Sequence, residues 1–130
     1  HVQAAALRGR VPISHPSVMM RTEAVHRIGG YHLDAYPAED LDLFLRLGEI
    51  GEIDNLPQCV LKYRMHGQSI SATLSERQVI KMRRACEMAW GRRGITGVFD
   101  ALIEPKPEAG CPIKANPTAS ALAASVRTDD

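Results

Sequence analysis

Two adjacent carboxylates, Glu39 and Asp40, stand at the start of the apolar segment AEDLDLFLRL. Acids at a helix N-terminus have an ordinary structural explanation, because the exposed amides and the helix dipole stabilise negative charge by roughly 0.3–1 kcal/mol. The chemical alternative is a general base, since an ionised carboxylate fixed at the entrance of a packed helix can take a proton from an alcohol. Position alone favours the structural explanation.

Asp42 and Arg46 are spaced i, i+4 on the same segment. Such a pair is expected as an exposed salt bridge that contributes about 0.2–0.5 kcal/mol. Arg46 could instead lie one turn below Glu39 and Asp40 and orient one of their carboxylates. The sequence leaves both interpretations open.

A second polar group follows in the segment LKYRMHGQSIS, which carries Arg64, His66, Ser69 and Ser71. A strand that ends in arginine and continues into a loop with histidine and hydroxyls is suited to anion binding. Arg64 could contact phosphate oxygens, and His66 could bind phosphate or a divalent metal. A solvated loop with an isolated histidine is the alternative.

Several short elements must position these residues. Thr22 reads as the N-cap of a helix that ends at Gly29-Gly30, where glycine tolerates a left-handed exit. The leucine spacing predicts an amphipathic helix from Glu39 that ends before Gly51, with its acids and Arg46 on the polar face. The other expected elements are strands over 17–20, 53–56 and 59–64 and a long helix over 75–90.

Composition limits the function classes. The chain has 130 residues and a net charge of +1, which fits one small domain and argues against a dedicated nucleic-acid binder. No apolar run reaches the roughly 18–20 residues that span a bilayer. The three cysteines, Cys59, Cys86 and Cys111, form neither a disulfide framework nor a zinc motif, which fits a reducing cytosol. The start at His1, with no signal peptide, favours a fragment.

The second half of the chain changes character. The basic helix over 75–93 is expected to dock on its own domain through an apolar stripe, Val79, Met82, Cys86 and Ala89; contact with an acidic membrane surface or a polyanionic acceptor is the alternative. The Pro/Ala-rich composition after residue 104 predicts a disordered tail, because it cannot bury enough surface to offset chain entropy.

The ordered set HPSVMMR, GGY, AEDLDLFLRL and LKYRMHGQSIS, over roughly residues 13–71, resembles the C-terminal half of a family 2 glycosyltransferase with the GT-A fold. The resemblance implies an α/β fold, a partial Rossmann-like domain for nucleotide-diphospho-sugar transfer. It divides the chain into that half-domain at 1–74, an amphipathic basic helical extension at 75–103 and the tail at 104–130.

The resemblance also implies site roles. Asp40 would be the catalytic base of an inverting sugar transfer, with Glu39 and Arg46 in support. The loop residues Arg64, His66, Ser69 and Ser71 would lie at the donor diphosphate, with Mn²⁺ or Mg²⁺ as cofactor and His66 as a metal ligand. The residues expected to line the sugar and acceptor cleft are His15, Gly29, Gly30 and Tyr31.

The family further implies a nucleotide-sugar donor, a glycan or lipid-linked acceptor and a role in cell-surface polysaccharide or glycan synthesis, in the cytoplasm or at the cytoplasmic membrane face. The QxxRW signature of polymer synthases is absent, which favours single addition. No DxD-like metal motif precedes His15, so we expect the chain to be inactive alone. The alternatives are a non-catalytic remnant or interaction module, and a metal-dependent hydrolase built on Glu39, Asp40 and His66.

Overall fold

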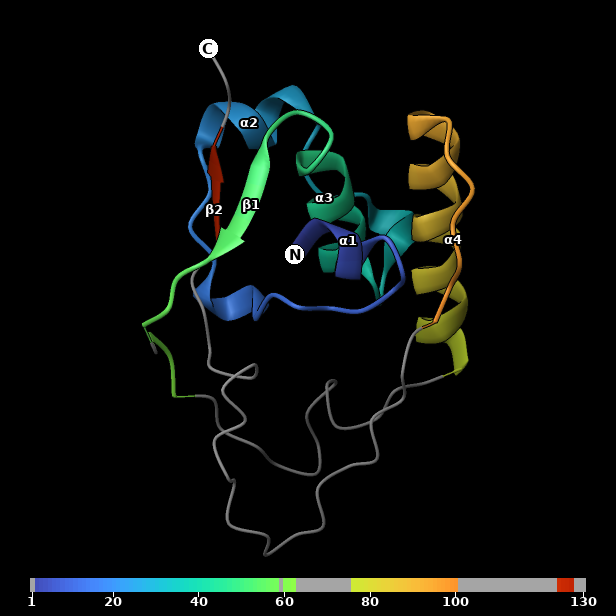
Figure 1. Ribbon diagram of the computed structural model, residues 1–130, viewed down its shortest axis with the longest axis horizontal. Helices are drawn as coiled ribbons and strands as arrows, with labels where there is room; N and C mark the ends of the chain where they lie inside the picture. Colours follow the sequence, from blue (N-terminus) through green and yellow to red (C-terminus); the bar gives the residue numbers. More distant parts are fainter. Residues whose placement is uncertain (1, 59, 63–75, 101–123, 128–130) are drawn as a thin grey trace, which may run out of the picture.

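The computed structural model describes residues 2–58, 60–62 and 76–100, and the backbone alone of 124–127. The elements follow in the order α1 (Val2–Ala6), η1 (His15–Ser17), α2 (Thr22–Arg27), η2 (Leu33–Ala35), α3 (Glu39–Leu47), β1 (Glu52–Asn55), α4 (Glu76–Arg93) and β2 (Ala124–Arg127), where η marks a 3₁₀ turn. Figure 1 shows α3 in the middle, with α4 along one side and the two strands on the other.

Helix α3 is the centre of the core. Leu41 and Leu45 pack towards α4, against Met82, Ala85, Cys86 and Ala89. The other side of α3 packs in a second cluster of buried residues, which consists of Leu43, Phe44 and Leu47 with Ile13, Ala24 and Ile53. Every residue from Leu41 to Leu47 is buried. The expectation of an exposed polar face over Asp42 and Arg46 is therefore wrong, because other segments cover the helix there as well.

The long helix α4 docks on its own domain, as one of the two interpretations predicted. Met82, Cys86 and Ala89 of the expected stripe are buried, and Val79 is partly buried. Several of its basic side chains have intramolecular partners: Arg92 binds Glu49 at 2.8 Å, Arg93 donates to the Leu45 carbonyl at 3.0 Å, and Lys81 donates to the Asp34 carbonyl. These contacts give part of the basic charge a structural role, and contact with an acidic membrane surface stays a prediction.

The short helix α1 has no counterpart among the expected elements. It is held by distant contacts: Gln3 Nε2 of the helix donates to the Gly51 carbonyl at 2.9 Å, and Trp90 Nε1 donates at 2.9 Å to the carbonyl of Leu7, the residue that follows the helix. A five-residue segment has little helical stability of its own, so this helix depends on packing that the local sequence does not display.

Strands β1 and β2 form a two-stranded antiparallel ribbon in which Ile53 pairs with Val126. β1 fulfils the strand expected at 53–56, within one residue at each end. β2 lies inside the segment 104–130 that was expected to be disordered, so that expectation is wrong for Ala124–Arg127. An unpaired strand edge offers free amides and carbonyls, which explains why a segment of weak composition can pair there.

Other boundaries also differ from the sequence prediction. The strand expected at 17–20 is wrong, because Ser17 ends the 3₁₀ turn η1, in which Pro16 fixes the backbone, and residues 18–20 belong to no helix or strand. α2 is present, but Arg21 rather than Thr22 is its N-cap, with no side-chain capping bond. α3 ends at Leu47 with Gly48 as its C-cap, one turn before Gly51.

Residues 60–62 are not in a strand, and Cys59 and 63–64 lie outside the described residues, so the strand expected at 59–64 is not observed where the structure can show it. Within the described residues, Cys86 is a free, buried thiol. No helix in the described part of the chain is both long and apolar enough to cross a membrane.

Candidate functional site

Four of the residues expected from the sequence gather at the first turn of α3. Glu39 and Asp40 open the helix, His15 comes from η1, and Tyr31 follows the glycine exit of α2. His15 Nε2 and the Tyr31 hydroxyl are hydrogen-bonded at 2.7 Å. The His15 ring meets Phe44 of α3 edge-on, with ring centroids 6.1 Å apart. The structure thus brings together residues separated by up to 25 positions in the chain.

The glycine exit places Tyr31. Gly29 and Gly30 have φ of 82° and 70°, in the left-handed region where a side chain is strained, so the predicted helix exit is confirmed. These two residues reverse the chain after α2 and return it towards α3, and Tyr31 is the first residue after the turn. Tyr31 is 44% exposed, so solvent and any ligand can reach its ring.

Asp40 differs from a simple helix-end acid in the direction of its pKa shift. Its Oδ1 accepts the Leu41 amide at 2.7 Å, a contact that by itself lowers the carboxyl pKa. Burial outweighs that contact and raises the pKa of Asp40; Glu39 adds to the rise, and the charge of His15 opposes it. An acid that only stabilised the helix terminus would be expected to have a lowered pKa.

Glu39 shows a second departure from a purely structural role. Its Oε2 atom is buried and has no hydrogen-bond partner among the described residues. Buried polar atoms are nearly always paired, because an unpaired one has lost its water without replacement. A ligand hydroxyl is a group that could donate to this oxygen.

The phenol of Tyr31 is influenced by the same two acids. Its pKa is raised, first by burial and then by the charges of Asp40 and Glu39. Tyr31 therefore keeps its proton well above neutral pH and remains a neutral hydrogen-bonding group. His15, Tyr31, Glu39 and Asp40 together form a compact set of hydrogen-bonding groups around one basic carboxylate. We call these four residues the first-turn site.

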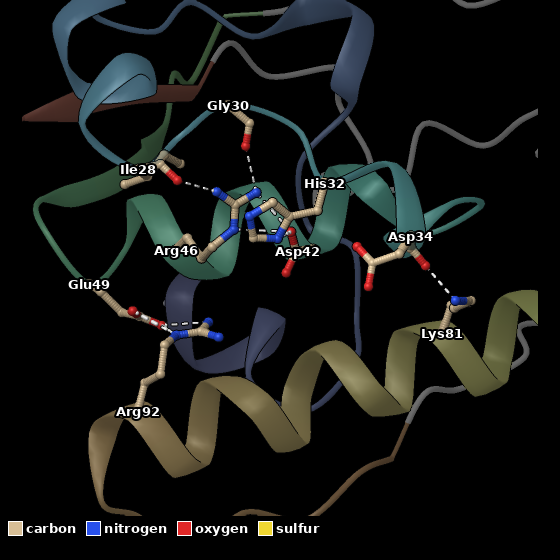
Figure 2. Close-up of polar contacts among 9 residues, drawn as sticks. All are labelled: Ile28, Gly30, His32, Asp34, Asp42, Arg46, Glu49, Lys81 and Arg92. Carbon is tan, nitrogen blue, oxygen red and sulfur yellow. Dashed lines mark hydrogen bonds and ion pairs between the residues drawn. The ribbon is translucent and has the colours of Figure 1, made fainter.

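Arg46 lies elsewhere on α3, in a buried ion pair (Figure 2). Its Nε and Nη2 donate to Asp42 Oδ2 at 3.0 and 2.8 Å, and its Nη1 and Nη2 donate to the carbonyls of Ile28 and Gly30 at 2.8 and 2.7 Å. The two side chains are 7% and 4% exposed, so the expectation of a surface salt bridge is wrong. These hydrogen bonds of Arg46 run to Asp42 and the glycine turn, and not to Glu39 or Asp40.

His32 completes that pair and was missed by the sequence analysis. Its Nδ1 lies 3.1 Å from Asp42 Oδ2. The one signal in the sequence is indirect: a buried acid needs several donors, and His32 is a polar residue next to the glycine turn.

The loop residues expected at the donor diphosphate, Arg64, His66, Ser69 and Ser71, lie outside the described residues. Within the described part of the chain, no group of three or more His, Cys, Asp or Glu side chains could hold a metal ion. The described residues therefore do not fit the expected Mn²⁺ or Mg²⁺ by themselves, and we derive no chemical step through a metal.

Comparison with known proteins finds a partial similarity to a glycosyltransferase. Over 59 residues, 43% of the chain, the sequence is 39% identical to the O-antigen biosynthesis glycosyltransferase WbnJ of Escherichia coli. The match spans 23% of that protein's length. No family model and no solved structure matches the chain. The similarity indicates a relationship to glycosyltransferases.

Proposed function

We propose that the chain is the acceptor-side part of an inverting glycosyltransferase of the family 2 type, with a partial GT-A fold, that acts in cell-surface polysaccharide synthesis. The observation that carries the proposal is the first-turn site, where a carboxylate of raised pKa lies among hydrogen-bonding groups suited to a sugar. The partial similarity to a glycosyltransferase supports the same reaction class.

In the proposed reaction Asp40 acts as the general base. It takes the proton of an acceptor hydroxyl as the oxygen of that hydroxyl attacks the anomeric carbon of the donor sugar. The new glycosidic bond forms while the bond from the anomeric carbon to the nucleotide diphosphate breaks on the opposite face, which inverts the configuration. A raised pKa makes the carboxylate a stronger base than an ordinary aspartate, and Asp40 must be ionised to act.

The other residues of the first-turn site would hold the acceptor. Glu39 Oε2, which has no partner among the described residues, would accept a hydrogen bond from a neighbouring sugar hydroxyl. The hydrogen-bonded pair of His15 and Tyr31 would contact the acceptor sugar on its other side and fix the orientation of the sugar ring. Holding the acceptor hydroxyl next to the base in this way makes the reaction effectively unimolecular and so faster.

The donor side of the proposal depends on residues that the structure does not describe. We propose that Arg64, His66, Ser69 and Ser71 contact the diphosphate of a nucleotide-sugar and that a divalent metal assists there. The acceptor is a glycan or a lipid-linked saccharide at the cytoplasmic face of the membrane. The 130-residue chain by itself is proposed to be inactive.

Sugar transfer by an Asp40→Asn variant tests the proposal. The assay uses the full-length gene product that contains these residues, with UDP-, GDP- and dTDP-sugars, Mn²⁺ and lipid-linked saccharide acceptors. We expect the variant to bind UDP, GDP or dTDP as the wild type does in calorimetry, and to transfer sugar roughly 10²–10⁴-fold more slowly, the usual effect of losing a general base.

Asp34→Asn is the matched control, because Asp34 is an exposed acid of η2 and should leave transfer unchanged. Wild-type transfer by Asp40→Asn would rule out Asp40 as the base. If the full-length product bound none of the three nucleotides and transferred no sugar, the chain would be better explained as a remnant or an interaction module.

A further inference from the structure

Tyr31 lies between two anchored neighbours. On one side, the Gly30 carbonyl accepts a hydrogen bond from Arg46 Nη2 at 2.7 Å, and the Ile28 carbonyl accepts one from Nη1 at 2.8 Å. On the other side, His32 Nδ1 lies 3.1 Å from Asp42 Oδ2. Figure 2 shows these contacts converging on one guanidinium and one carboxylate of α3.

The anchoring pair is itself fixed. Arg46 and Asp42 belong to the stretch of α3 in which every residue is buried. The planar guanidinium of Arg46 donates hydrogen bonds in two directions: to Asp42 Oδ2 and to the carbonyls of Ile28 and Gly30. A planar fork holds its partners at fixed angles, which a lysine ammonium cannot do.

Apart from the contact of its ring and hydroxyl with His15, Tyr31 is held in place through its neighbours in the chain. Its side chain is 44% exposed, and it follows two glycines with positive φ, which are the residues that restrict the backbone least. The approach of its hydroxyl to His15 therefore depends on where the carbonyls before it and the histidine after it are anchored.

We propose that Arg46 and Asp42 are positioning residues, which tie the loop 28–32 to α3 so that the Tyr31 hydroxyl meets His15 beside Glu39 and Asp40. This proposal rests on the proposed function, which gives the first-turn site its role in sugar transfer. It adds an explanation of how the residues of that site are held together. Arg46 supports the reaction through Tyr31 rather than by touching either acid.

The test follows the Tyr31 hydroxyl directly. The 130-residue chain is labelled with tyrosine carrying ¹³C at Cζ, and its three tyrosines are titrated by NMR; Tyr31→Phe identifies the Tyr31 signal. In the wild type, burial and the charges of Asp40 and Glu39 raise the Tyr31 pKa. In Arg46→Lys, which keeps the charge but loses the fork, we expect the Tyr31 midpoint to fall towards the ordinary tyrosine value.

Arg92→Lys is the matched control. Arg92 also binds a carboxylate, with Nε donating to both oxygens of Glu49 at 2.9 Å each and Nη2 lying 2.8 Å from Oε1, but it joins α4 to the segment after α3. We expect Arg92→Lys to leave the Tyr31 midpoint unchanged. A Tyr31 midpoint unchanged in folded Arg46→Lys, or lowered equally in Arg92→Lys, would overturn the proposal.

His32→Ala covers the case in which Arg46→Lys does not fold. His32 is 41% exposed, so its loss removes one anchor with little loss of packing. We expect a smaller fall of the Tyr31 midpoint, and no change would overturn the role of this anchor. The titration contains no sugar, so its result does not depend on the transfer assay. A failed transfer assay would contradict the proposed function alone. An unchanged Tyr31 midpoint would contradict the positioning role alone.

Discussion

The first turn of α3 carries two aspartates, Asp40 and Asp42, in different surroundings. Asp42 is buried, and its Oδ2 receives two contacts from Arg46 and lies close to His32. Asp40, two residues earlier, accepts the amide of Leu41, and burial together with Glu39 raises its pKa. Within one helical turn, one aspartate thus belongs to a buried ion pair, and the other has a raised pKa.

The difference shows how one helix can serve both assembly and chemistry. A paired, buried acid holds neighbouring loops in place through its ion pair and hydrogen bonds. An acid whose ionised form is disfavoured by burial lowers the stability of the fold when it is ionised. The same burial raises its pKa and so increases its affinity for a proton. Because both acids belong to one rigid helix, the loop that Asp42 helps to hold is placed relative to Asp40.

The largest effect on stability is expected from breaking the buried pair. Arg46→Met leaves the Asp42 carboxylate without its main partner and the carbonyls of Ile28 and Gly30 without their donor. Loss of one partner from a buried ion pair costs roughly 3–5 kcal/mol. Urea unfolding followed by circular dichroism measures this loss.

Arg92→Met is the matched comparison for that loss. The pair of Arg92 with Glu49 has side chains that are 33% and 22% exposed, so its loss should cost at most about 1 kcal/mol. Equal losses in the two variants would mean that the Asp42–Arg46 pair is no more important to the fold than a surface contact.

A smaller effect of opposite sign is expected at Asp40. Because its folded pKa is raised, the folded state binds the proton more readily than the unfolded state, and stability falls as pH rises from about 3.9, the ordinary aspartate value, through the raised one. Asp40→Asn removes this penalty, so we expect it to be at least as stable as the wild type at pH 7. A clear loss of stability in urea unfolding at pH 7 would mean that the ionised carboxylate stabilises the fold.

Local patterns predicted the elements of the site but not their surroundings. The segment AEDLDLFLRL correctly indicates a helix beginning at Glu39, and Gly29-Gly30 correctly marks the end of α2. The i, i+4 spacing of Asp42 and Arg46 correctly pairs them, but the sequence cannot show which segments cover that face. Burial of the pair and the role of His32 follow from the path of the loop after α2, which is a tertiary property.

For the first-turn site, the sequence likewise indicated the residues but not their contacts. The residue types of His15, Tyr31, Glu39 and Asp40 suggested a site through their resemblance to a family, whereas their spacing in the chain says nothing about contact. Their meeting depends on how η1 and the glycine turn each pack against α3. The helix α1 and the pairing of β2 with β1 depend likewise on distant partners.

The most direct measurement is an NMR titration of the Asp40 carboxyl carbon in the wild-type chain and in Glu39→Gln. We expect a wild-type midpoint above about 3.9, the ordinary aspartate value, and a lower midpoint in Glu39→Gln, because Glu39 contributes to the raised pKa of Asp40. A wild-type midpoint at or below the ordinary value would contradict the account, since it would make Asp40 a helix-end acid stabilised by the amides of α3.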